Sequence, residues 1–219
     1  MSEINISVFG LGYVGIVSAC CFANNRHKVV GVDISEEKVD LINQGTPPII
    51  EPGLDQLLKK VINNNLFKAT QSALQAINES NVSLICVGTP SKTDGSIELS
   101  YLKQVVNELG SLLAKKNSFH IVVLRSTVVP GTIRNVVLPI LEKSTGKQCG
   151  KGFGLVFVPE FLREGSAIED FYKPLKTVIG QYDSNSGSII KKLFEDFGGI
   201  INCVSIETAE MTKYLDNSW

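Results

Sequence analysis

Three glycines near the N-terminus have the spacing of a phosphate-binding turn. Gly10, Gly12 and Gly15 stand in the string FGLGYVG, after an apolar run at residues 4–9 and before a stretch with helical spacing. In this strand–turn–helix context the first glycine permits a tight turn, the second leaves room for a diphosphate, and the third lets the helix pack on the strand. Free N–H groups at the start of the helix would then face the phosphates. The string therefore predicts a dinucleotide site.

An acidic residue follows the second apolar run. Asp33 ends residues 28–33, at the distance of about 20 residues that is typical of a ribose contact. A carboxylate there can accept hydrogen bonds from both hydroxyls of an adenosine ribose, and it would repel a 2′-phosphate. Glu36 and Glu37 add to that repulsion, and Lys38 could reach the same ribose or face solvent. We therefore expect the cofactor to be NAD rather than NADP.

Polar residues follow three further apolar runs. Thr89 comes directly after ICVG, Thr127 lies in LRSTVVPGT, and Glu160 and Glu164 lie in FVPEFLREG. Parallel strands of an open α/β sheet bring their carboxyl ends to one edge, where ligands bind. One threonine at such an end could be a helix cap, but three clusters at one edge are better explained by a site.

The last residues place two polar groups side by side. Lys213 and Asn217 stand four apart in AEMTKYLDNSW, so a helix would project both from one face. A lysine and an asparagine on neighbouring turns can donate hydrogen bonds to one oxygen. Tyr214, Leu215 and Trp219 are expected on the buried side of the same helix. No glycine cap, proline or polar tail follows, so the sequence carries no helix stop signal here.

Short apolar runs alternate with helical patterns along the chain. Unbroken, β-branched runs of this kind are typical of a parallel sheet that is covered on both faces. The sequence therefore predicts an α/β fold, a doubly wound parallel sheet of the Rossmann type over residues 1–204, followed by the beginning of a linking helix at residues 205–219. The expected strands are residues 4–9, 28–33, 67–70, 82–88, 120–126, 155–158, 177–180 and 200–203. The expected helices are residues 14–21, 35–45, 54–62, 99–115, 132–141 and 187–197, and residue 205 onward.

Composition narrows the choice of partners. With 21 basic and 22 acidic residues, the net charge of −1 argues against nucleic acid or an anionic membrane as the main partner. The N-terminus has no secretory signal pattern and no run reaches about 18 apolar residues, so we expect a cytoplasmic protein. Five cysteines fit a reducing compartment, and all except Cys149 are expected to be buried. His27 and His120 are expected to be structural, and no metal constellation is visible.

Seven strings together resemble the UDP-glucose/GDP-mannose dehydrogenase family. They are FGLGYVG, GVDISEEKVDLINQG, PIIEPGL, ICVGTPS, RSTVVPGT, PEFLREG and AEMTKYLDNSW, in the family's order and spacing over essentially the whole chain. The strings VGTPSKTDGS and STVVPGT and the final Asn-Ser-Trp look more like members that act on GDP-mannose than those that act on UDP-glucose. One departure is Val158, where many relatives have asparagine.

The resemblance implies a reaction and a set of roles. The family oxidises a sugar's terminal primary alcohol to a carboxylate, using two NAD molecules in succession. Glu160 would act with a water as general base, while Lys213 and Asn217 would hold the oxygen on the reacting carbon. The implied catalytic residues are Glu160, Lys213, Asn217 and Thr127. Those implied to hold the cofactor are Gly10, Gly12, Tyr13, Val14, Gly15, Asp33, Lys38, Thr89 and Thr127. Those implied to contact the nucleotide sugar are Glu160, Phe161, Leu162, Glu164, Lys213 and Asn217.

The family's thiol nucleophile has no counterpart in these residues. In the family it is a cysteine in a loop of the form F-G-G-S-C-x-P-K-D, and none of the five cysteines has that context. We therefore expect an N-terminal portion that binds NAD without completing the reaction, taken from an enzyme that is a homo-oligomer. The substrate could instead be UDP-glucose or a UDP-N-acetylhexosamine. A non-catalytic NAD-binding module is the alternative from another class.

Overall fold

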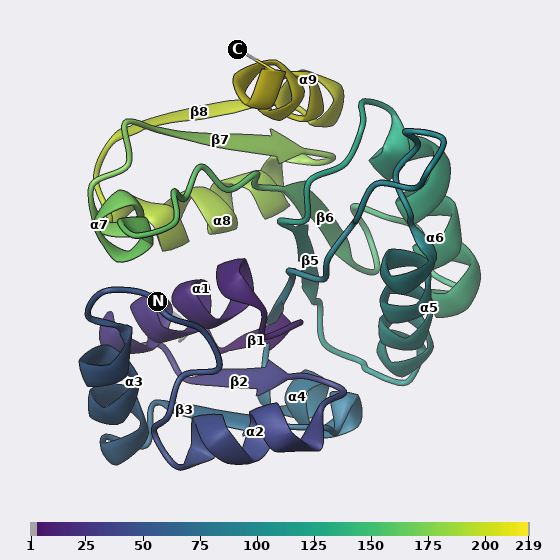
Figure 1. The fold of residues 1–219 in the computed structure, drawn as a ribbon. Helices are drawn as coiled ribbons and strands as arrows, with labels where there is room; N and C mark the ends of the chain where they lie inside the picture. The colour runs from purple at the N-terminus through teal and green to yellow at the C-terminus, as the bar shows by residue number, and fades with distance from the viewer. Residues whose placement is uncertain (1–3, 219) are drawn as a thin grey trace.

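The short apolar runs form the strands of one eight-stranded sheet in the computed structural model, which describes residues 4–218 (Figure 1). The strands are β1 (Ile6–Phe9), β2 (Val29–Val32), β3 (Phe67–Thr70), β4 (Val82–Ile85), β5 (Ile121–Leu124), β6 (Gly154–Phe157), β7 (Lys176–Gln181) and β8 (Ile200–Ser205). Their order is β3-β2-β1-β4-β5-β6-β7-β8, and the first six run parallel. This arrangement confirms the predicted Rossmann-type fold.

Helices cover both faces of the sheet. They are α1 (Tyr13–Asn24), α2 (Glu36–Asn43), α3 (Leu54–Asn63), α4 (Ala73–Glu79), α5 (Ser100–Ala114), the π-helical turn η1 (Ile133–Val137), α6 (Leu138–Thr145), α7 (Ala167–Tyr172), α8 (Ser184–Glu195) and α9 (Ile206–Ser218). One face packs against α1, α2, α3, α7 and α8, and the other packs against α4, α5, α6 and α9. Both faces need cover because β1, β2, β4, β5 and β6 are buried along their whole length. Within residues 4–218, none of these helices is both long and apolar enough to cross a membrane.

The last two strands break the parallel pattern, which corrects the expectation of a wholly parallel sheet. β7 runs antiparallel to β6, and β8 runs parallel to β7. Two residue pairs join β6 to β7, Val156 with Gln181 and Phe157 with Gly180. Because these pairs lie at the carboxyl ends of both strands, the beginning of β7 extends beyond the carboxyl edge of the parallel strands. This extension forms a wall above the edge where ligands of such folds bind.

Two short helices, α4 and α7, escape the sequence prediction. They have 7 and 6 residues, too few to repeat a helical pattern of apolar positions. The other expected helices are present with shifted ends, although the stretch at residues 132–141 begins with the π-helical turn η1. Ser35 caps α2 as expected, and its hydroxyl accepts a hydrogen bond from the N–H of Lys38 at 3.3 Å.

A cluster of aromatic rings ties α1 to the last third of the chain. Phe22 of α1 makes edge contacts with Phe171, Phe194 and Phe197, at ring-centroid distances of 5.2, 5.4 and 5.4 Å. Each such pair contributes roughly 0.5–1.5 kcal/mol beyond the area that it buries. The helix that follows the glycine turn is therefore held firmly against α7 and α8.

The cysteines depart from expectation at three positions, of which the first is Cys86, partly exposed rather than buried. Cys20 and Cys21 are buried in α1, as expected, whereas Cys149 is 5% exposed and therefore also buried. Cys149 is covered because its segment folds back on itself through an isolated bridge to Phe153. Cys203 is exposed because it lies on β8, which is an edge strand.

His120 is buried and structural, as the sequence indicates. Its Nε2 lies 2.7 Å from the hydroxyl of Ser83, and its Nδ1 lies 3.2 Å from the ammonium group of Lys116. An ammonium group can only donate, so Nδ1 accepts and the Nε2–H donates to Ser83. Burial, with a smaller contribution from the Lys116 charge, lowers the pKa of His120 to about 3.

We expect the chain to lose stability as the pH falls from 6.5 towards 3, because His120 gains a proton in the unfolded chain before it does so in the folded one. The loss from this group amounts to about 2 kcal/mol at pH 5. Urea unfolding at pH 7 and pH 5 measures it. A His120→Gln chain should show a smaller difference between the two pH values, and an unchanged difference would contradict the assignment.

Candidate active site

The glycine turn joins β1 to α1 through backbone groups that side chains would obstruct. Gly10 has a φ of +89°, and its N–H donates to the carbonyl of Val32 at 2.8 Å. α1 begins at Tyr13, and its N-cap Gly12 has no side chain to satisfy the first N–H groups. These donors remain available to an anion, with the positive end of the helix dipole behind them. The turn thus has the geometry predicted for holding a diphosphate.

Asp33, which follows β2, lies beside the glycine turn and is held there by two backbone hydrogen bonds. Its Oδ2 accepts from the N–H of Leu11 at 2.9 Å, and its Oδ1 accepts from the N–H of Ser35 at 3.0 Å. Lys38 lies 3.8 Å from the same carboxylate. The two backbone bonds orient the carboxylate between the glycine turn and α2, and each oxygen retains a lone pair for a hydroxyl. This arrangement fits the ribose contact predicted from the sequence.

A crevice of about 270 Å³ opens above the glycine turn, beside the loops that follow β4 and β5. The hydroxyl of Thr89 donates to the carbonyl of Thr127 at 2.6 Å, and that of Ser126 donates to the carbonyl of Val87 at 2.6 Å. The two loops therefore hold each other in place. Of the predicted residues, those that line this dinucleotide crevice are Gly12, Tyr13, Val14, Thr89, Thr127 and Glu160.

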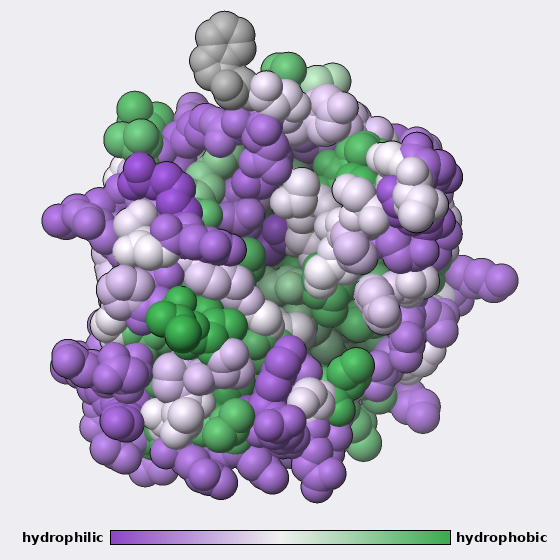
Figure 2. Space-filling view, in the orientation of Figure 1, coloured by the Kyte–Doolittle hydropathy of each residue, from purple (hydrophilic) through white to green (hydrophobic). Residues whose placement is uncertain are grey.

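A second, larger crevice of about 570 Å³ lies among the loop after β6, α7, β7 and α9. The ammonium group of Lys213 lies 3.2 Å from Oε1 of Glu160, and the two side chains are 7% and 14% exposed. Lys213 also lies 5.2 Å from the ring centroid of Phe161. Since Glu160 lines the dinucleotide crevice and Lys213 the larger one, this ion pair marks where they meet. Figure 2 shows the surface hollowed near the centre of this face.

The predicted substrate residues divide between the two crevices and the surface. Phe161, Leu162, Lys213 and Asn217 line the larger crevice. Glu164 is exposed and lines neither crevice. Lys213 and Asn217 therefore share one side of α9, as their spacing predicts, with Lys213 buried and Asn217 exposed.

The buried face of α9 differs from the expected one. Tyr214 and Leu215 are 49% and 59% exposed, which corrects the expectation that they are buried. Trp219, expected on the same side, lies outside the described residues. The positions that α9 buries are Ile206, Ala209, Glu210 and Lys213. This spacing is that of an ordinary helical face, but two of its members are charged, so apolar residues alone misplace it.

Arg125 is a site residue that the sequence prediction overlooks. It is 4% exposed and lines both crevices. Its guanidinium carbon lies 5.9 Å and 5.6 Å from the ring centroids of Phe171 and Phe194. Its Nε has no hydrogen-bond partner among the described residues, and burial lowers the pKa of the group. An arginine directly after a buried apolar strand, in LRSTVVPGT, is the signal that could reveal it.

We expect Arg125→Met to raise the free energy of unfolding by about 1–2 kcal/mol, because methionine keeps the contact with the two rings and removes a buried charge. Urea unfolding followed by circular dichroism measures the change. Lys176→Met is the control, since the Lys176 side chain is 40% exposed and should contribute little. A net loss of stability in Arg125→Met would contradict the expectation and show that the charge supports the fold.

The glycine turn, Asp33 and both threonine loops all lie within the part of the chain that matches a known protein family. Residues 4–198 match the family model described as "UDP-glucose/GDP-mannose dehydrogenase family, NAD binding domain". The chain belongs to this family. Its cofactor is NAD, and the open N–H groups of the glycine turn and the carboxylate of Asp33 fit that dinucleotide.

Members of the family from several organisms resemble the chain over nearly its whole length. The GDP-mannose 6-dehydrogenase of Pseudomonas putida is 50% identical over 216 residues, which are 99% of this chain and 49% of that protein. A ternary-complex crystal structure of GDP-mannose dehydrogenase from Pseudomonas aeruginosa matches with a TM-score of 0.97 at 45% identity, over 99% of this chain and 50% of that one. UDP-glucose dehydrogenase from Pyrobaculum islandicum matches with a TM-score of 0.93 at 36% identity, over 98% and 49%. The chain thus spans about half the length of these relatives.

Proposed function

We propose that the chain forms the NAD-binding half of an enzyme that oxidises the primary alcohol of GDP-mannose to the carboxylate of GDP-mannuronate. The observation that carries this proposal is the pair of Glu160 and Lys213, 3.2 Å apart where the two crevices meet. A sugar in the larger crevice could place its terminal carbon there, next to the dinucleotide. GDP-mannose is favoured because the two relatives reported above that are named for it are 50% and 45% identical, against 38% and 36% for two that are named for UDP-glucose.

The charges of Glu160 and Lys213, where the two crevices meet, suggest a chemical role for each residue. When bound, NAD accepts the hydride that leaves the sugar carbon. Lys213 and Asn217 donate hydrogen bonds to the oxygen on that carbon, which gains negative charge as its proton departs. Glu160 acts with a water as general base when the thioester that the second oxidation forms on the family's cysteine is hydrolysed, which releases the carboxylate and frees the thiol. Thr127 lines the crevice beside Glu160. Phe161 and Leu162 contact the sugar.

The proposal also covers the cellular location, the oligomeric state and the alternative substrate of the whole enzyme. We place it in the cytoplasm as a homo-oligomer, with a UDP-sugar as the alternative substrate. A non-catalytic NAD-binding module is less well supported, because such a module has no need for Glu160, Lys213 and Asn217 around the two crevices.

The test uses the 219 residues as they stand. They contain no cysteine in the glycine-rich loop that carries the family's nucleophile, so we expect NAD binding without steady formation of a uronic acid. Calorimetric titration with NAD measures the first, and incubation with NAD and either GDP-mannose or UDP-glucose, followed by chromatography, measures the second. Steady formation of a uronic acid would contradict this division of roles. Failure to bind NAD would contradict the cofactor site itself.

A further inference from the structure

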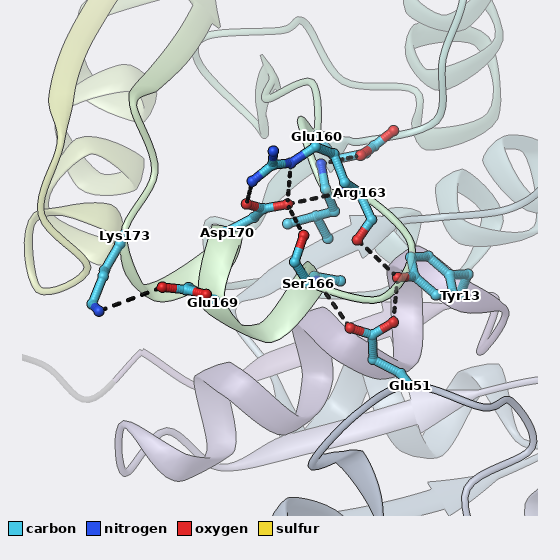
Figure 3. A network of polar contacts seen from close by, with 10 residues as sticks. Tyr13, Glu51, Glu160, Arg163, Ser166, Glu169, Asp170 and Lys173 are labelled. Carbon is cyan, nitrogen blue, oxygen red and sulfur yellow. Dashed lines mark hydrogen bonds and ion pairs between the residues drawn. The ribbon is translucent and has the colours of Figure 1, made fainter.

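A buried carboxylate outside the predicted site joins three distant parts of the chain. Glu51 is 6% exposed and lies in the loop between α2 and α3. Its Oε2 accepts from the hydroxyl of Tyr13 at 2.6 Å and from the N–H of Gly165 at 2.9 Å. Its Oε1 accepts from the N–H of Ala167 at 2.8 Å. Figure 3 shows Tyr13 and Glu51 pointing toward each other beneath the loop that carries Arg163 and Ser166.

These partners lie on elements that form the walls of both crevices. Tyr13 is the first residue of α1 and lines the dinucleotide crevice. Gly165 lies in the segment between Glu160 and α7, and Ala167 is the first residue of α7; other residues of this segment and of α7 line the larger crevice. The hydroxyl of Tyr13 also lies 3.2 Å from the carbonyl oxygen of Arg163. One carboxylate therefore lies between the end of α1 that faces a diphosphate and the loop that faces a sugar.

The loop at residues 163–167, beside the larger crevice, is cross-linked by several polar contacts and is anchored to Glu51. Arg163 forms a paired contact with Asp170, in which Nη2 lies 2.6 Å from Oδ1 and Nε lies 3.1 Å from Oδ2. The N–H of Arg163 donates to the same carboxylate at 2.9 Å, so the loop is closed on α7. Ser166, the N-cap of α7, makes no side-chain capping bond. Glu51 takes over that role from outside the helix, because it accepts the N–H of Ala167.

The hydrogen bonds to Glu51 are strong because its carboxylate is ionised. Burial alone would raise the pKa of Glu51, but hydrogen bonds from Tyr13, Gly165 and Ala167 outweigh burial and hold the pKa below its ordinary value. Burial, together with the neighbouring Glu51, raises the pKa of Tyr13, so its hydroxyl remains a donor. Hydrogen bonds to an ionised acceptor are roughly twice as strong as neutral ones.

We propose that Glu51 is a positioning residue that transmits NAD binding at α1 to the loop at residues 163–167. A dinucleotide on the glycine turn restrains Tyr13, Tyr13 restrains Glu51, and Glu51 restrains the two N–H groups that anchor the loop. Binding of the cofactor then orders one wall of the larger crevice. The inference rests on NAD binding and does not depend on which sugar the enzyme uses.

The test is amide hydrogen exchange at Gly165 and Ala167, followed by NMR in the 219-residue chain with and without saturating NAD. In the wild-type chain we expect NAD to slow exchange at both amides by about fivefold or more, the lower end of typical coupling between sites. Tyr13→Phe keeps the bonds from Glu51 to the loop but breaks the link to α1. We expect it to retain the slow exchange of the free chain and to lose the effect of NAD.

Two further variants separate this role from a general effect on the fold. Glu51→Gln should lose protection at both amides even without NAD, because an amide cannot accept from three donors as the carboxylate does. Glu79→Gln is the matched control, since Glu79 accepts from Lys68 and Gln75 and lines neither crevice. It should respond to NAD as the wild type does.

Three results would overturn the proposal, and calorimetric titration of each chain with NAD distinguishes the third from the first two. NAD binding to the wild type without slower exchange at Gly165 and Ala167 would overturn the coupling alone. An NAD effect of the same size in Tyr13→Phe would do so as well, and this variant remains informative if Glu51→Gln does not fold. Absence of NAD binding to the wild type would overturn the cofactor site together with the coupling.

Discussion

Gly12→Ala should abolish tight NAD binding in a chain that stays folded, whereas Gly15→Ala should damage the fold itself. A Cβ on Gly12 meets no atom of the protein within 4 Å, so alanine there occupies the space that a diphosphate needs. Two charge-assisted hydrogen bonds to phosphate, each worth roughly 1.5–3 kcal/mol, would be lost. The affinity for NAD should therefore fall by about 100-fold or more. A Cβ on Gly15 would instead overlap the carbonyl oxygen of Gly10.

The cost at Gly15 is structural because the atom that the new Cβ would overlap belongs to the backbone of Gly10 and cannot rotate away. Overpacking of this kind typically costs about 1–3 kcal/mol, and separating α1 from β1 would cost at least that. Urea unfolding and calorimetric titration with NAD, carried out on both variants, measure the two effects, and each variant is the control for the other. If Gly12→Ala binds NAD like the wild type, the diphosphate does not lie on this turn. If Gly15→Ala unfolds at the wild-type urea concentration, the close contact between helix and strand is not needed.

Asp33→Ala should remove the preference for NAD over NADP. The carboxylate stands at the ribose position, where a 2′-phosphate about 4 Å away would be repelled by about 4 kcal/mol at the dielectric constant of a protein surface. We therefore expect the wild type to prefer NAD by about 100-fold or more, and the variant to prefer it by less than about tenfold. Part of the change should come from weaker NAD binding, because two hydroxyl groups lose their acceptor.

The ratio of the affinities for NAD and NADP is the quantity to compare, because a general weakening of the site affects both affinities and cancels in the ratio. Asp33 also accepts the N–H groups of Leu11 and Ser35, so its removal weakens the local backbone for both cofactors alike. Calorimetric titration of each chain with NAD and NADP gives the ratio directly. Glu37→Gln is the control: it removes a nearby exposed charge whose repulsion is screened by solvent and leaves those bonds intact, so the ratio should change far less than in Asp33→Ala. Equal affinity of the wild-type chain for NAD and NADP would refute the ribose assignment.

The parts of the site that could be predicted are those that depend on residues near one another in the sequence. The glycine turn and Asp33 each follow a strand whose apolar pattern is visible, and the topology of such folds then sets where they lie. The same holds for Thr89, Thr127 and Glu160, which come directly after strands. Local pattern is sufficient because each of these residues takes its position from the strand before it.

The parts that could not be predicted depend on contacts between distant residues. Glu51 stands 38 residues from Tyr13 and 116 from Ala167, and its own surroundings, PIIEPGL, resemble any rigid loop. The direction of β7 and the exposure of Tyr214 and Leu215 follow from how β7 joins β6 and from the charged residues that α9 buries. No periodicity within one element carries that information.

The short pairing between β6 and β7 indicates where the sheet should open locally. It has two residue pairs, whereas each neighbouring pair among the first six strands of the sheet has four and the pair of β7 and β8 has six. Opening that stops short of unfolding occurs where the fewest backbone bonds must break, so the sheet should part along Val156 and Phe157. Glu160 follows β6, whereas Lys213 belongs to α9, which packs on β7. Separation of β6 from β7 should therefore stretch this ion pair and widen the passage between the two crevices.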